Sequence, residues 1–257
     1  GLILSCFLFV SLALAQAPQY LPADIPLDEA AIFVEMTPAP EYVQITKSII
    51  EQLRRNHYSE IHFNDDFSGI MLDSYIKTLD GARMYFTQAD ITEFEQYRNS
   101  LDDLLLNGDT DAGYLIFNRY QARLEKRLIY SIKQIEDESN VFDFSVDEYI
   151  ALDRTEVPWA NNRAELEDLW RKQVKSSVLS LKLTEKELPE VRETLSKRFR
   201  SQLSQVLKTN SLDVYQRYMD AMTMAFDPHT QYYAPRAAEN FNMSMRLSLE
   251  GIGAVLT

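Results

Sequence analysis

The chain is poor in the residues that make turns and cross-links. Its 257 residues include seven glycines, nine prolines and one cysteine. So little glycine and proline argues against an all-β sandwich or barrel, which needs many tight turns. Leu, Glu, Gln, Lys, Arg, Ala and Met are abundant, and these residues favour helices. Because 46% of the residues are apolar, a core of ordinary size can be buried. The composition predicts an all-α fold.

Common catalytic, nucleotide-binding and metal-binding motifs are absent. The sequence has no Gly-x-x-x-x-Gly-Lys-Ser/Thr, no Gly-x-Gly-x-x-Gly and no Gly-x-Ser-x-Gly. His57 and His62 would lie about 140° apart on a helix, so they do not form a ligand pair. Acidic runs such as 65–66, 102–103 and 136–138 are interpreted as helix-start charges or solvated faces, not as acid–base pairs. We expect no metal site and no cofactor.

The chain is strongly acidic, with a formal net charge of −13. Residues 1–15 contain no Asp, Glu, Lys or Arg, so all of this charge lies on residues 16–257. A protein with this balance is repelled by phosphate groups unless it concentrates its cations. We therefore expect no nucleic-acid partner.

The first fifteen residues (GLILSCFLFVSLALA) form an apolar run that ends in Ala13-Leu14-Ala15. This pattern predicts a signal peptide over 1–15, because the run is shorter than the 18 or so residues that a membrane span needs. Its removal would discard Cys6, which would exclude disulfides, thiolate metal sites and a thiol nucleophile from the mature protein. Because the chain opens with Gly1 and not Met, we expect it to be a fragment.

Residues 16–40 carry five prolines among small and acidic residues. We predict an extended Pro-rich leader there, with packing that begins only at Glu41. From 41 to 235 the apolar residues recur at helical spacing, which predicts a helical domain of about seven helices. The repeating positions are 45, 49 and 53; 67, 70, 71 and 75; 91, 94, 101 and 105; 166, 169, 170, 174, 178 and 181; 195, 199, 203 and 206; 214, 218, 222 and 226.

Local signals mark where several of these helices begin and end. Thr87 can cap the third segment, and Asn107-Gly108 can close it. A long helix over 111–138 is expected to span the domain, and the segment 140–159 interrupts the helical pattern. Asn162, with Glu165 three residues later, imitates a capping box, and Pro189 suits a first helical turn.

The last twenty-two residues, 236–257, differ from the helical part. Residues 243–249 alternate apolar and polar side chains, which predicts a strand. Gly251, Ile252, Gly253 and Ala254 follow, and successive N–H groups in such a loop can hold a carboxylate. The alternative is an ordinary hairpin turn with no ligand.

With these residues, the sequence resembles the tail-specific, or C-terminal processing, protease family in its large bacterial branch. The strongest matching blocks are 226–232 (FDPHTQY), 234–236 (APR) and 248–256 (SLEGIGAVL). Weaker upstream matches are 55–58 (RNHY), Pro158-Trp159, 164–166 (AEL), Leu169-Trp170 and 180–184 (SLKLT). The resemblance covers roughly 41–257 and implies that 236–257 is a linker and the start of a truncated PDZ domain.

That resemblance implies a periplasmic serine endopeptidase that recognises apolar or unstructured C-termini of substrate proteins through a PDZ domain. Its serine would be activated by a lysine, and neither residue of this dyad can be assigned in the chain. The substrate-contacting residues implied are Gly251, Ile252, Gly253 and Ala254. Implied partners are the substrates and the protein's own PDZ and protease domains, with room for an adaptor protein. The sequence does not decide whether the leader stays tethered to the membrane. The alternative is an exported helical binding module without peptidase activity.

Overall fold

The structure is a computed structural model that describes residues 24–28, 32–57, 62–227 and 229–233. Over these residues it contains eight α-helices, one short 3₁₀ helix and no strand beyond a single bridge between Thr87 and Ala160. The elements are α2 (Tyr42–Asn56), α3 (Asp65–Asp80), α4 (Gln88–Phe94), η1 (Glu95–Tyr97), α5 (Leu101–Leu106), α6 (Asp111–Glu136), α7 (Arg163–Lys182), α8 (Leu188–Val206) and α9 (Ser211–Phe226). The prediction of a helical fold is confirmed for this part of the chain.

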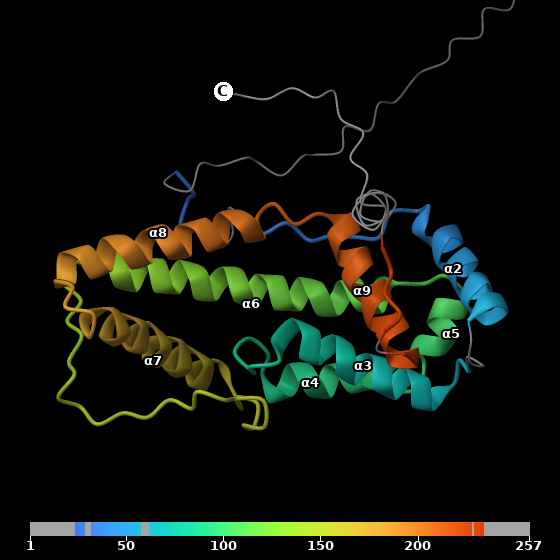
Figure 1. The fold of residues 1–257 in the computed structure, drawn as a ribbon, viewed down its shortest axis with the longest axis horizontal. Helices are drawn as coiled ribbons and strands as arrows, with labels where there is room; N and C mark the ends of the chain where they lie inside the picture. The colour runs from blue at the N-terminus through green and yellow to red at the C-terminus, as the bar shows by residue number, and fades with distance from the viewer. Residues whose placement is uncertain (1–23, 29–31, 58–61, 228, 234–257) are drawn as a thin grey trace, which may run out of the picture.

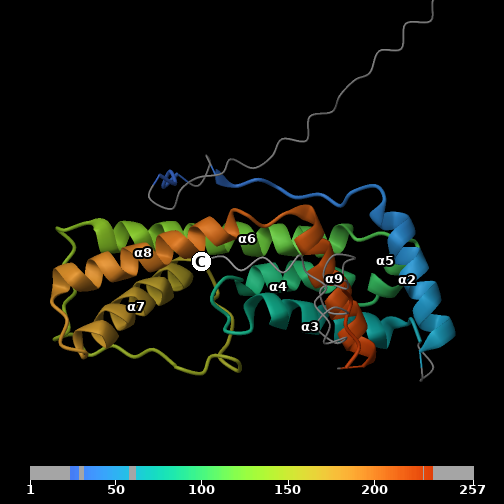
Figure 2. The same cartoon turned by 45° about the horizontal axis from the view of Figure 1, so that its top comes forward.

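The long helix α6 runs through the length of the molecule and joins its two halves (Figures 1 and 2). At one end α2, α3, α5 and α9 surround its first turns, where Ile116 and Phe117 enter one hydrophobic core. At the other end α7 and α8 pack along its second half, where Leu128 and Ile132 enter a second core. The predicted long helix that spans the domain is therefore confirmed.

The predicted helix caps are confirmed, with one difference in detail. Thr87 and Asp90 form a complete capping box at the start of α4. Asn162 accepts a hydrogen bond from the backbone N–H of Glu165 at 3.0 Å, but the Glu165 carboxylate bonds the backbone N–H of Asn161 instead of that of Asn162. Pro189 lies in the first turn of α8, where its missing N–H costs nothing.

Two details of the predicted helical pattern are wrong. The third segment is not one helix, because α4 passes into η1 and the turn before Leu101 separates it from α5. In α2 the buried positions are Tyr42, Thr46 and Ile50. Of the predicted positions, Ile45 is exposed, whereas Ile49 and Leu53 are half-buried against the core. Tyr42 stacks on Tyr215 of α9, and the Thr46 hydroxyl lies 2.9 Å from the Tyr215 hydroxyl. Because of these contacts with α9, the helix turns Tyr42 and Thr46 inward, and the predicted position Ile45 faces outward.

The expectation that packing begins only at Glu41 is also wrong. Ile25 and Ile32 are 3% and 4% exposed, and both belong to the core between α6, α7 and α8. Further along, the backbone N–H of Met36 donates to the Asn118 side chain at 3.0 Å, and that side chain donates back to the Met36 carbonyl. A few apolar anchors and one amide pair are enough to hold an extended segment against α6.

Several predictions fall on other parts of the chain. The predicted signal peptide 1–15, the strand over 243–249 and the loop Gly251–Ala254 lie outside the described residues. The first strands of a PDZ domain therefore stay a prediction. Among the helices that the structure describes, none is long and apolar enough to cross a membrane.

The contact between α6 and α9 yields a prediction about stability. A Cβ on Gly113 would lie 2.5 Å from ring atoms of Tyr218. We expect Gly113→Ala to lower the free energy of unfolding by about 1–3 kcal/mol, because the overpacking outweighs the gain of about 1 kcal/mol in helix propensity. The matched control is Gly69→Ala in α3, whose Cβ would make an ordinary 3.4 Å contact with the flexible Arg98 side chain. Urea unfolding that shows the same change for both variants would contradict this packing.

Candidate functional site

A tight loop between α3 and α4 is organised by one buried carboxylate, that of Asp80. Its Oδ1 accepts the backbone N–H of Met84 at 2.7 Å, and its Oδ2 accepts those of Tyr85 and Phe86 at 2.8 Å each. Burial raises the pKa of Asp80, and the three backbone hydrogen bonds and the charge of Arg127 only partly offset that rise. The carboxylate thus fixes the path of the chain from the last turn of α3 to the cap of α4.

The same loop contacts segments from three other parts of the chain. The Trp170 indole of α7 donates to the Met84 carbonyl at 2.7 Å, and Arg127 of α6 donates to the Tyr85 hydroxyl at 2.7 Å. Arg83 has a left-handed φ of 51° and donates to the Val157 carbonyl at 2.6 Å. The backbone N–H of residue 88 then donates to the carbonyl of residue 160 at 2.8 Å. The loop is therefore the point at which α3, α4, α6 and α7 are tied together.

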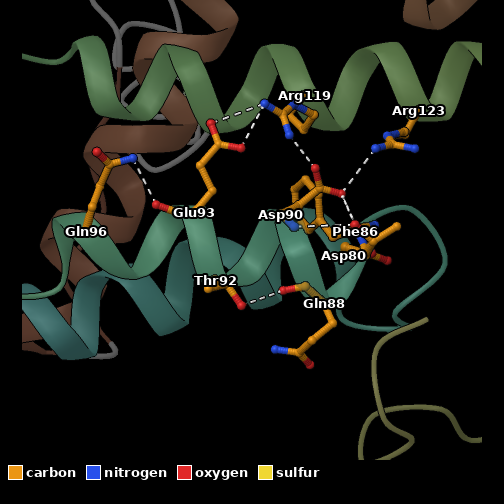
Figure 3. A network of polar contacts seen from close by, with 10 residues as sticks. Asp80, Phe86, Gln88, Asp90, Thr92, Glu93, Gln96, Arg119 and Arg123 are labelled. Atoms are coloured by element: carbon orange, nitrogen blue, oxygen red, sulfur yellow. Dashed lines mark hydrogen bonds and ion pairs between the residues drawn. The ribbon is translucent and has the colours of Figure 1, made fainter. Parts of the chain in front are cut away.

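A second buried carboxylate, Asp90 of α4, lies opposite two arginines of α6 (Figure 3). Its oxygens accept from the Thr87 backbone and hydroxyl at 2.8 Å each, from Arg119, and from Arg123 at 3.3 Å. Burial raises the pKa of Asp90, but the Thr87 hydrogen bonds and the two arginines outweigh it, and the pKa lies below its usual value. Arg119 also pairs with Glu93 at 3.1 Å. Because each oxygen of Asp90 is engaged, this group is a clamp between two helices and is not available as a base.

Another buried acid, Glu125, has no cationic partner. It lies on α6 between the two cores, 2% exposed, and accepts one hydrogen bond from the Gln121 amide at 2.7 Å. Glu125 Oε2 and Gln121 Oε1 are buried without a hydrogen-bond partner. Burial raises the pKa of Glu125 from 4.5 to about 7, and the Gln121 hydrogen bond offsets only part of that rise. A protonated Glu125 could donate from Oε2, so the neutral acid suits this position better than the anion.

The block that follows α9 folds into a turn that reaches the end of α2. The Asp227 carboxylate accepts the backbone N–H of His229 at 3.2 Å and the Thr230 hydroxyl at 3.0 Å, and these bonds lower the pKa of Asp227. The His57 Nε2 lies 3.3 Å from the Thr230 hydroxyl oxygen. In a nucleophile–base–acid triad the acid orients the base. Here Asp227 accepts the hydrogen bond of the Thr230 hydroxyl itself, so the arrangement is a structural turn.

The structure brings together polar residues that the sequence analysis did not single out. Asp80, Asp90 and Glu125 were not recognised, because acidic residues on helices are usually solvated. The Thr87 cap with Asp90 three residues on was the available local signal for the clamp. The predicted substrate-binding residues Gly251, Ile252, Gly253 and Ala254 lie outside the described residues, so their role stays a prediction. Over the residues that the structure describes, no cluster of three or more His, Cys, Asp or Glu could hold a metal ion.

Comparison with known proteins identifies a family and a related protease. A family profile described as the tail specific protease N-terminal domain matches residues 49–236, from the middle of α2 through α9 and the turn at Asp227. A curated tail-specific protease from Haemophilus influenzae is 34% identical over 259 residues. The alignment covers 98% of this chain but only 36% of that relative.

The Asp90 clamp yields a prediction with a matched control. Asp90→Asn leaves Arg119 and Arg123 without their buried counter-charge, and we expect it to lower the free energy of unfolding at pH 7 by about 2 kcal/mol. Glu93→Gln removes the exposed partner of Arg119 and should cost less than about 0.5 kcal/mol. Because the pKa of Asp90 is lowered on folding, its contribution is present at neutral pH and is lost in the acid range. An Asp90→Asn deficit in urea that persists undiminished at pH 3 would contradict this assignment.

For Glu125 we predict a dependence of stability on pH that is opposite to that of Asp90. Its pKa is raised on folding, so the folded chain holds more protons than the unfolded chain between pH 4.5 and about 7, and stability falls as the pH rises through that window. Glu125→Gln keeps an acceptor for Gln121 and adds a donor, and we expect it to be about 2–3 kcal/mol more stable than the wild type at pH 8. At pH 4.5 the two proteins should be nearly equal. The measurement is chemical unfolding of both proteins between pH 4.5 and pH 8. If the stability of the two proteins changes with pH in the same way, the pKa of Glu125 is not raised by burial.

Proposed function

The chain belongs to the tail-specific protease family, and we propose that the whole protein is a periplasmic serine endopeptidase that degrades or processes substrates recognised by their C-termini. The helices described above are the N-terminal domain of a member of this family. The family match over residues 49–236 is the observation that carries the proposal. The related protease from Haemophilus influenzae supports it, because it aligns along nearly the whole chain.

In this proposal the catalytic residues belong to a part of the protein that this chain does not include. The alignment spans 36% of the related protease, so most of that relative has no counterpart here. The contacts of three lysines on α7 and α8 agree with this view. Lys172, Lys175 and Lys197 are each ion-paired with a carboxylate: Asp168, Glu148 and Glu193 respectively. A lysine that activates a serine must instead be desolvated and neutral.

The proposed role of the helical domain is to position other parts of the enzyme. Its two largest cores share α6, and polar contacts tie α4 and the α3–α4 loop to that helix and α7 to the loop. A stiff body of this kind can dock against PDZ and protease domains and help to enclose a substrate tail. It also offers surface to an adaptor protein. Within the proposal, Gly251–Ala254 present backbone N–H groups to the terminal carboxylate of the substrate, and Ile252 lines the apolar pocket beside it.

The test uses the protein encoded by the complete reading frame. We expect it to cleave an unfolded substrate with an apolar C-terminus, to be blocked by a serine-directed inhibitor, and to act more slowly when that C-terminus is amidated. Ile252→Asp places a charge beside the bound carboxylate and should reduce cleavage of tail-bearing substrates with little loss of stability. The present chain alone should show no turnover.

Two results would overturn the proposal. One is a reading frame that continues past Thr257 without a serine and lysine that are both essential for cleavage. The other is cleavage by the present chain above the buffer background. The first result would favour an exported helical binding module without peptidase activity.

A further inference from the structure

A pocket of about 500 Å³ lies beside the loop that Asp80 organises. It is bordered by the end of α3, the middle of α6, one face of α7 and the irregular segment at 150–154. Side chains that line it include Tyr85, Arg127, Ile150 and Arg154. The Asp90 clamp and the turn at Asp227 do not line this space.

Two guanidinium groups at this pocket lack a carboxylate partner. Arg127 bonds the Tyr85 hydroxyl and lies over its ring, while its Nε is buried with no hydrogen-bond partner. Arg154 donates from Nε to the Ala82 carbonyl at 3.2 Å. Two other described arginines, Arg83 and Arg192, bond backbone carbonyls. Those that are ion-paired with carboxylates include Arg55, Arg98, Arg119, Arg123, Arg163, Arg171 and Arg200. In a chain of net charge −13, two cations that line one pocket and are not paired with a carboxylate can attract an anion.

Asp80 does not fill this role, although it also lines the pocket. Its two oxygens accept three backbone N–H groups of the loop. It attracts Arg127 and Arg154 electrostatically but forms no hydrogen bond or ion pair with either. Asp80, Arg127 and Arg154 are the charged residues of the lining, so their formal sum is one positive charge. A ligand with a single negative charge would neutralise the pocket, whereas a phosphate dianion would leave it with one net negative charge.

The remaining lining residues indicate the rest of the ligand. Ile150 and Leu152 provide apolar surface, and Leu152 is 99% exposed as the structure stands. Gln173 and Ser176 of α7 add neutral hydrogen-bonding side chains. This combination matches a short peptide segment with one carboxylate and an apolar side chain.

We propose that this pocket binds a peptide carboxylate through Arg127 and Arg154, with the apolar part of the peptide against Ile150 and Leu152. The carboxylate can be a chain terminus or an acidic side chain, since both present the same two oxygens to a guanidinium. The site lies within the helical domain and does not depend on the proposed peptidase activity.

Binding is tested with the full 257-residue chain and three labelled apolar peptides, by fluorescence anisotropy. The first has a free C-terminal carboxylate, the second is its amide, and the third is an amide with one internal Glu. We expect saturable binding of at least one carboxylate peptide, at least about tenfold tighter than the uncharged amide and weakened by added salt. The first and third peptides distinguish a terminal carboxylate from a side-chain carboxylate. Equal binding of all three would overturn the proposal.

Two arginine variants with the same loss of charge test the location. Arg154→Gln removes one guanidinium of the pocket and should weaken binding about tenfold. Arg55→Gln is the matched control on α2, which lies at the opposite end of the molecule from α7 (Figure 1), and should leave binding unchanged. If Arg154→Gln binds as tightly as Arg55→Gln, the site is wrong.

Two further variants separate this site from folding defects and from the proposed tail-recognition loop. Arg127→Gln should weaken binding more strongly, and its urea unfolding is measured alongside because it also loses the Tyr85 hydrogen bond. Ile252→Asp should leave the Arg154-dependent binding unchanged. A loss of that binding in Ile252→Asp with full binding in Arg154→Gln would assign the peptide to the loop and would overturn the pocket.

Discussion

The carboxylate of Asp80 is the constraint from which much of the fold follows. By accepting three successive backbone N–H groups it turns the chain sharply at the end of α3 and leaves Thr87 in place to cap α4. The same turn directs the Met84 carbonyl to Trp170 of α7. One short loop therefore determines how α3, α4 and α7 meet. The long helix α6 contacts α4 through Arg119 and the loop itself through Arg127.

Three buried acids on this framework show how the kind of partner sets the pKa of a carboxyl group. Asp90 faces two guanidinium groups and the Thr87 cap, and its pKa is lowered despite burial. Asp80 has three N–H dipoles but no direct cationic partner, and its pKa is raised. Glu125 has a single amide donor, and its pKa rises to about 7. The charge of a neighbouring guanidinium compensates a buried carboxylate for its lost hydration, whereas N–H dipoles compensate for it only in part.

Much of this architecture could be predicted from local sequence, and the failures share a physical cause. Long periodic segments such as α6 and α7, and caps such as Thr87 and Asn162, depend on residues a few positions apart. The buried face of α2 depends instead on Tyr215, far along the chain, and the burial of Asp90 depends on Arg119 of another helix. The apolar spacing continues across the break between α4 and α5, because Leu101 and Leu105 are both buried. The family was recognisable from contiguous blocks, but those blocks do not reveal which acids are buried.

The distribution of polar groups also separates contacts that hold the fold together from groups that are open to a ligand. Asp90 is saturated, Asp227 is committed to a turn, and Lys172, Lys175 and Lys197 of α7 and α8 are ion-paired. Groups held in this way stabilise a fold but cannot exchange protons or partners during a reaction. Arg127 and Arg154 differ, because their charge is not matched by a carboxylate in contact. Unmatched charge beside apolar surface is where a binding partner gains most free energy of binding.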